Sequence, residues 1–128
     1  MKYLLDTQVL IWTAFRSSQL PERAGEILRE NRRDLVFSVA SLWEVSIKSA
    51  LGRADFTVDP AHLRSGLLGH GYAELLVNGD HAVAVRPLPR IHGDPFDRML
   101  LAQAIYEGMT LVTTDRMLAS YGEPVLKV

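Results

Sequence analysis

The sequence predicts an α/β fold, because short apolar strands alternate with helical segments along the whole chain. The strand segments are continuous apolar runs, which is typical of a parallel sheet that is covered on both faces. With 128 residues, of which 48% are hydrophobic, the chain is long enough to bury one sizeable core. No internal repeat or interdomain linker interrupts the pattern. We therefore expect residues 1–128 to form one domain with a mostly parallel sheet.

The first elements are predicted from apolar runs and from the residues that start or stop helices. Residues 2–6 (KYLLD) form an apolar run that ends on an acid and predict a strand, followed by a helix over 7–15. Pro21 suits the first position of a second helix. This helix ends near the basic residues 32–33, because positive charge stabilises a helix C-terminus. Residues 35–38 (LVFS) predict the second strand.

Glycine and proline mark the elements in the rest of the chain. Ser38 or Ser41 caps a third helix, which stops at Gly52. A fourth helix starts at Pro60 and is broken by the glycines that follow position 68. The remaining elements are a strand at 72–77, a helix at 79–85, a long helix from 94–95 to 107, a strand at 109–113, a helix at 116–121 and an edge strand at 124–128.

Composition excludes several classes of function. The chain has no cysteine, and therefore no disulfide, thiolate zinc site or cysteine nucleophile. Its net charge of −1 is not that of a polycation, so charge neither demands nor excludes an RNA substrate. No apolar run is long enough to span a membrane, and the N-terminus does not resemble a signal peptide. We expect a cytoplasmic protein that does not contact the membrane.

Acidic residues follow the predicted strands. Asp6 ends the first strand, and Asp115 follows the strand at 109–113. Open α/β sheets place their sites at the carboxyl ends of strands, near the point where the strand order reverses. Glu44 lies in the helix after the second strand, and Asp97 lies in the first turn of the long helix. These four acids are the candidate functional residues.

The same acids also have structural alternatives. Glu44 is one helical turn before Lys48 and could form a surface ion pair with it. Asp94 is a suitable N-cap, and Asp97 is then a first-turn acid that the helix dipole stabilises. Asp115 could likewise be the N-cap of the helix that it precedes.

The helix that carries Glu44 has an apolar stripe at helical spacing. The stripe comprises Val39, Leu42, Trp43, Ile47, Ala50 and Leu51. Glu44 lies at its border. We expect Leu42 and Trp43 to be core residues rather than part of a binding surface.

Four carboxylates at one sheet edge would repel one another, and burying them unpaired is costly. A hard divalent cation such as Mg²⁺ or Mn²⁺ removes this cost, because it takes carboxylates, waters and substrate phosphates as ligands. Such a site can polarise a phosphodiester and lower the pKa of bound water. The pattern favours metal-dependent phosphoryl transfer, although periodicity alone does not establish that the four acids converge.

Four ordered motifs resemble those of the PIN domain family and, more narrowly, of VapC-type toxins of toxin–antitoxin pairs. They are LLDTQVLIW, SVASLWEVSIK, HGDPFDRMLLAQA and LVTTD, and together they span nearly the whole chain. The resemblance implies an α/β/α sandwich around a parallel sheet of about five strands. It also implies a Mg²⁺- or Mn²⁺-dependent endoribonuclease, a cognate VapB-like antitoxin and a homodimer.

The resemblance assigns the catalytic acidic quartet to Asp6, Glu44, Asp97 and Asp115. By analogy Asp6 and Asp97 are the surest metal ligands, and Asp115 and Glu44 complete or adjust the site. Thr7 and Thr113 occupy hydroxyl positions beside the first and last acids, where a substrate contact is expected.

Three further residues lie next to the predicted site. Arg98 and Arg116 each follow a quartet acid, and they could hold RNA phosphates or balance the acidic patch. His92 precedes the long helix and is either a substrate contact or an ordinary loop residue.

Two other functions compete with RNA cleavage. One is a Mg²⁺-dependent phosphatase, but Thr7-Gln8 follows Asp6, so the D-x-D nucleophile pair of haloacid-dehalogenase-like phosphatases is absent. The other is a non-catalytic PIN-like binding module, which the intact quartet disfavours. Metal-dependent RNA cleavage, compared with phosphatase turnover, separates the three.

Overall fold

The computed structural model describes residues 1–128 and contains one five-stranded sheet in which all neighbouring strands are parallel. The strands, in the order β3-β2-β1-β4-β5, are Tyr3–Leu5 (β1), Leu35–Ser38 (β2), Ala73–Leu75 (β3), Thr110–Thr113 (β4) and Val125–Lys127 (β5). The chain builds outward from β1 to β3 and then crosses to β4, so the strand order reverses between β1 and β4. The α/β fold with a parallel sheet, expected from the sequence, is confirmed.

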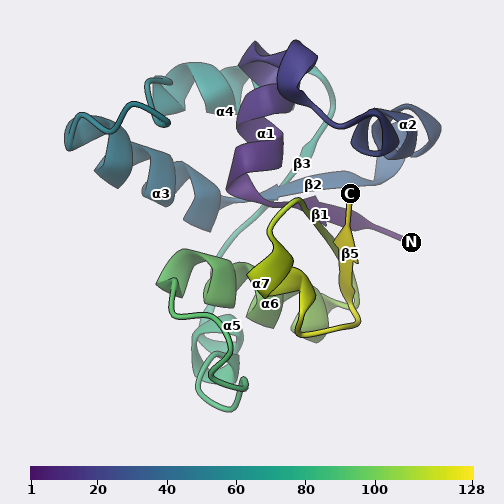
Figure 1. Ribbon diagram of the computed structural model, residues 1–128, viewed down its shortest axis with the longest axis vertical. Coiled ribbons are helices and arrows are strands. Elements are labelled where there is room, and N and C mark those ends of the chain that lie inside the picture. The colour runs from purple at the N-terminus through teal and green to yellow at the C-terminus, as the bar shows by residue number, and fades with distance from the viewer.

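Helices cover both faces of this sheet (Figure 1). They are Thr7–Phe15 (α1), Glu22–Glu30 (α2), Val39–Ala50 (α3), Pro60–Gly69 (α4), Gly79–Ala84 (α5), Pro95–Glu107 (α6) and Arg116–Ala119 (α7). Helices α1, α2 and α4 lie on one side of the sheet, and α5, α6 and α7 lie on the other. Two short 3-10 turns, Ser17–Gln19 and Arg32–Asp34, were not predicted. No helix is both long enough and apolar enough to span a lipid bilayer.

The central strands supply two hydrophobic cores, because successive side chains of a strand point to opposite faces. Leu5 of β1 packs in the core beneath α1, α2 and α4, whereas its neighbour Leu4 packs in the core beneath α6 and α7. Phe37 and Val36 of β2 divide in the same way. The sheet is therefore buried on both faces, as the continuous apolar runs predicted.

The helices that follow β1 and β4 begin on acids. Asp6 caps α1 by accepting a hydrogen bond from the backbone N–H of Val9 at 2.9 Å. Asp115 caps α7 in the same way, and Asp94 caps α6, as expected. Since a capping side chain is held against the first turn of its helix, these carboxylates are fixed at the carboxyl edge of the sheet.

One packing prediction was wrong. Trp43 was expected in the core, but 63% of its surface is exposed. Helix α3 contacts α1, α4 and α6, and it buries a face that carries Ser41, Glu44 and Val45 instead of the apolar stripe. This face can be buried because its polar groups have hydrogen-bond partners inside the protein. The periodicity of apolar residues in the sequence does not reveal such partners. Trp43 packs its edge against Phe96 of α6, with ring centroids 5.3 Å apart.

Candidate active site

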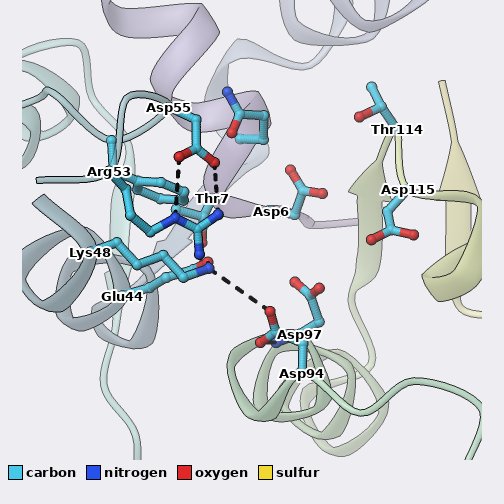
Figure 2. Close-up of a pocket in the computed structure, with 12 residues that line it drawn as sticks. Asp6, Thr7, Glu44, Lys48, Arg53, Asp55, Asp94, Asp97, Thr114 and Asp115 are labelled. Atoms are coloured by element: carbon cyan, nitrogen blue, oxygen red, sulfur yellow. Dashed lines mark hydrogen bonds and ion pairs between the residues drawn. The ribbon is translucent and has the colours of Figure 1, made fainter. Parts of the chain in front are cut away.

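A cleft of about 340 Å³ opens where β1 and β4 end, beside the reversal in strand order. Figure 2 shows the carboxylates that point into it from β1, α3, α6 and the end of β4. The acids that line it are Asp6, Glu44, Asp55, Asp94, Asp97 and Asp115. The structure thus brings together all four acids that the sequence singled out.

Asp6 is the most deeply placed of the aspartates in the cleft, with 5% of its surface exposed. One carboxylate oxygen caps α1, and the other accepts a hydrogen bond from the hydroxyl of Thr113. Burial raises the pKa of Asp6 to about 6, and the charges of Glu44 and Asp115 act in the same direction. The hydrogen bonds offset only part of this effect, so the negative charge of Asp6 is poorly compensated.

Asp97 lies in the first turn of α6 and faces Asp6 across the cleft (Figure 2). Burial, together with the neighbouring charges of Asp94, Asp6 and Glu44, raises its pKa to about 7, against a smaller effect of His92. The pKa values of Asp6 and Asp97 are therefore raised by the same two causes, desolvation and like charge.

Asp115 differs from Asp6 and Asp97, because the hydrogen bonds to its carboxylate lower its pKa by more than burial raises it. Burial alone would raise its pKa, but His92 and the backbone N–H groups of Leu118 and Met117 donate to its carboxylate and hold the pKa below the usual value. One oxygen caps α7, at 2.8 Å from the Met117 nitrogen, and the other lies 3.2 Å from His92 Nε2. Asp115 therefore caps α7 and lines the cleft at the same time.

Glu44 has both of its oxygens engaged. Lys48 Nζ lies 2.5 Å from one oxygen, and the hydroxyl of Thr7 donates to the other at 2.6 Å. Thr7 Oγ1 is also 2.9 Å from Ser41 Oγ. The Glu44–Lys48 ion pair considered from the sequence does form, but Glu44 is only 4% exposed and the pair lies inside the cleft. The negative charge of Glu44 is thus compensated by the protein, unlike those of Asp6 and Asp97.

The two threonines next to the quartet are buried. Thr113 is fully buried; its hydroxyl donates to Asp6 and accepts from the backbone N–H of Asp115 at 3.0 Å. Thr7 holds Glu44, as described above. Both hydroxyls therefore orient quartet acids, and Thr7 also lines the cleft, where the sequence predicted a substrate contact. Thr114, which the sequence analysis missed, lines the cleft next to Asp115.

The arginines predicted next to the quartet do not line the cleft. The guanidinium of Arg98 donates to the carbonyl oxygens of Pro89, Val85 and Leu88 at 3.0–3.3 Å and therefore holds a loop. Arg116 is exposed at the start of α7. Neither residue has the position that a phosphate contact inside the cleft requires.

The basic residues that do line the cleft are Lys48 and Arg53, opposite Asp115 (Figure 2). Lys48 Nζ lies 3.9 Å from Asp94, and it lies over the ring of Phe56, 4.7 Å from the ring centroid. Arg53 forms a two-point contact with Asp55 at 3.1 and 3.3 Å. Arg53 comes from the segment after α3, where the sequence contains no recognisable motif.

Replacing Thr113 by Val tests the two hydrogen bonds by which its hydroxyl links Asp6 to the backbone of Asp115. The change keeps the shape of the side chain but leaves one oxygen of the buried Asp6 carboxylate and the backbone N–H of Asp115 without a partner. We expect the free energy of unfolding to fall by about 1–3 kcal/mol, measured by urea denaturation. The matched control is Thr110→Val on the same strand, whose hydroxyl faces only the sulfur of Met1. A Thr113→Val variant as stable as this control contradicts the role of the hydroxyl.

The donor set of the cleft fits a hard divalent cation. Carboxylate oxygens are the ligands that Mg²⁺ and Mn²⁺ prefer, and a cation would offset the repulsion that raises the pKa values of Asp6 and Asp97. One ring nitrogen of His92 and one oxygen each of Asp97 and Asp115 also lie within 4.8 Å of one another. The geometry is therefore compatible with a cation held between α6 and the end of β4.

Comparisons with known proteins agree on one family. The PIN domain model matches residues 3–124. Ribonuclease VapC22 of Mycobacterium tuberculosis (strain ATCC 25618 / H37Rv) is 28% identical over 121 residues, which cover 94% of this chain and 92% of that protein.

The fold is also similar to those of solved structures. A DNA-bound VapBC from Salmonella typhimurium matches with a TM-score of 0.70 and 20% identity, over 99% of this chain and 98% of that one. A toxin–antitoxin complex from Klebsiella pneumoniae matches with a TM-score of 0.68 and 16% identity, over 98% and 97% of the two chains.

Proposed function

Because this chain belongs to the PIN domain family, we propose that it is a Mg²⁺- or Mn²⁺-dependent endoribonuclease and the toxin of a toxin–antitoxin pair. One observation carries the proposal: the four acids at the family's motif positions line one cleft at the carboxyl edge of the sheet. The curated relative named as a ribonuclease, which matches over nearly its whole length, supports the same reading.

The proposal gives the acids separate tasks. Asp6 and Asp97 are the principal metal ligands, because their negative charge is the least compensated. Asp115 completes the ligand set, and Glu44, which is already paired with Lys48, adjusts it. A bound divalent cation would polarise the scissile phosphodiester and lower the pKa of the attacking water.

The basic residues bind the RNA backbone in this proposal. Lys48 and Arg53 present positive charge on the side of the cleft opposite Asp115, where phosphate oxygens next to the scissile bond would lie (Figure 2). Arg116 is exposed beside Asp115 and could contact phosphates outside the cleft. Arg98 has no such task, since its guanidinium is used by the loop.

The partners follow from the same family membership. We propose that a cognate VapB-like antitoxin inhibits this chain, because the similar structures include VapBC and toxin–antitoxin complexes. We also propose that residues 1–128 act as one domain, that two copies form a homodimer, and that the protein acts on RNA in the cytoplasm.

The purified protein, incubated with transfer, ribosomal and messenger RNA, tests the proposed activity. We expect endonucleolytic cleavage that needs Mg²⁺ or Mn²⁺, stops with a chelator and stops when the antitoxin encoded by the neighbouring gene is added. Sequencing the new 5′ ends identifies the cleavage site. Turnover of a phosphate monoester without RNA cleavage would favour the phosphatase, and RNA binding without cleavage would favour the non-catalytic module.

A further inference from the structure

A polar clamp holds the loop between α5 and α6. Tyr121, just after α7, accepts a hydrogen bond from the backbone N–H of His92 at 3.0 Å and donates to the carbonyl of Pro89 at 2.8 Å. Arg98 of α6 donates to Tyr121 at 3.2 Å and to three carbonyls of the same loop. The loop is thus attached to α6 and to the segment that follows α7. Helix α6 carries Asp97, and Asp115 is the N-cap of α7.

The clamp directs the ring of His92 into the quartet. Its Nε2 lies 3.0 Å from an oxygen of Asp97 and 3.2 Å from an oxygen of Asp115. Its Nδ1 accepts a hydrogen bond from the backbone N–H of Asp94 at 3.2 Å. Since Nδ1 is an acceptor, the ring proton lies on Nε2 and faces the two carboxylates.

This tautomer argues that His92 is a donor to the carboxylates and not a ligand of the metal. Ligation through Nε2 requires its lone pair, which places the proton of a neutral ring on Nδ1. That proton would face the backbone N–H of Asp94, so that two donors would oppose each other. The geometry therefore fits a hydrogen bond from Nε2 to Asp115, with the Asp97 carboxylate within 3.0 Å of the same nitrogen.

We propose that His92 is a positioning residue of the metal site: its Nε2–H holds Asp97 and Asp115 in one arrangement, and the clamp of Arg98 and Tyr121 holds His92. This inference rests on the proposed function. Without this donor, the two carboxylates would repel each other and would have to be ordered by the cation itself. Partners that orient the ligands of a metal are typically worth about 10–100-fold in metal affinity.

Two substitutions of His92 separate this role from that of a loop residue. Asn can accept the hydrogen bond from Asp94 in place of Nδ1, but its amide is too short to reach the carboxylates. Gln places an amide N–H near the position of Nε2. We expect His92→Asn to weaken Mn²⁺ binding by about 10–100-fold, and His92→Gln to bind almost as tightly as the wild type.

Binding is measured by titrating the protein with Mn²⁺ and following the electron paramagnetic resonance signal of free aqueous Mn²⁺. The exposed His62, changed to Asn, is the matched control and should bind as the wild type does. Tyr121→Phe removes the hydroxyl that holds the loop without changing any acid, and we expect it to weaken binding by a smaller factor. Thermal unfolding establishes that each variant is folded.

Two results would overturn the inference alone. The first is a His92→Asn variant that binds Mn²⁺ as tightly as the wild type. The second is a directly coordinated nitrogen in the pulsed resonance spectrum of the Mn²⁺-loaded wild type that disappears in His92→Asn, which would make His92 a ligand. A wild-type protein that binds no Mn²⁺ would instead overturn the metal site of the proposed function, and this inference with it.

Discussion

Replacing Asp6 or Asp97 by Asn is expected to reduce RNA cleavage at least about 1000-fold, or about 4 kcal/mol of transition-state stabilisation. Asn keeps the size of the side chain but removes the negative charge, and with it a principal metal ligand. The fold should persist in both variants: Asn at position 6 is also a good N-cap and can keep the hydrogen bond from Val9 that starts α1, and Asp97 does not cap its helix, whose N-cap is Asp94.

A matched variant shows whether the loss is specific to the cleft. Asp59 caps α4 by accepting a hydrogen bond from the backbone N–H of Ala61 at 2.8 Å, and it does not line the cleft. Asp59→Asn therefore makes the same chemical change at another N-cap, and cleavage should continue at the wild-type rate. Initial rates on a defined RNA in saturating Mn²⁺ provide the measurement. Cleavage by Asp6→Asn at the wild-type rate would refute metal ligation by that residue.

The stability of the metal-free protein is expected to fall as the pH rises from 5 to 8. The folded-state pKa values of Asp6, about 6, and Asp97, about 7, exceed the ordinary value of 3.8. In this range the folded protein retains protons that the unfolded chain has released, so the free energy of unfolding decreases with increasing pH. The stabilisation is fully present below pH 3.8 and is lost as the pH passes through the folded-state values. Asp6 alone contributes about 3 kcal/mol over the whole range above pH 3.8, of which roughly half is lost between pH 5 and 8.

A divalent cation should remove this pH dependence, because it binds the deprotonated carboxylates of the folded protein only. Urea denaturation at several pH values, in a chelator or in excess Mn²⁺, measures both curves. In the chelator, Asp97→Asn should be more stable than the wild type at pH 8, because one repelling charge is gone. Stability that rises with pH in the chelator would contradict the raised pKa values.

The sequence predicted the parts of the site that lie on regular elements. Asp6 and Asp115 follow short apolar runs that predicted buried strands, and Asp94-Pro95 has the form of a helix start. The carboxyl ends of parallel strands meet at one edge, so the approximate position of these acids followed from the strand pattern alone. Glu44 and Asp97 were candidates from their helix positions, and the family motifs then assigned all four acids to one quartet.

The contacts around the acids could not be predicted, because they come from irregular segments or from buried polar faces. His92 lies in a loop whose path depends on the distant Arg98 and Tyr121. Arg53 reaches the cleft from a segment without periodicity. The apolar spacing predicted that Trp43 lies in the core. It contains no information on the polar partners by which Thr7 and Ser41 allow the face with Glu44 to be buried instead.

The hydrogen bond from Thr113 to Asp6 joins residues 107 positions apart. The contact can form only after β4 has paired with β1, which makes it one of the most non-local contacts of the fold. A nascent chain therefore lacks a complete acidic site until β4 and Asp115 have been synthesised and β4 can pair with β1. Because the proposed cleavage needs the acids of both strand ends together, we expect the growing chain to stay inactive through most of its synthesis.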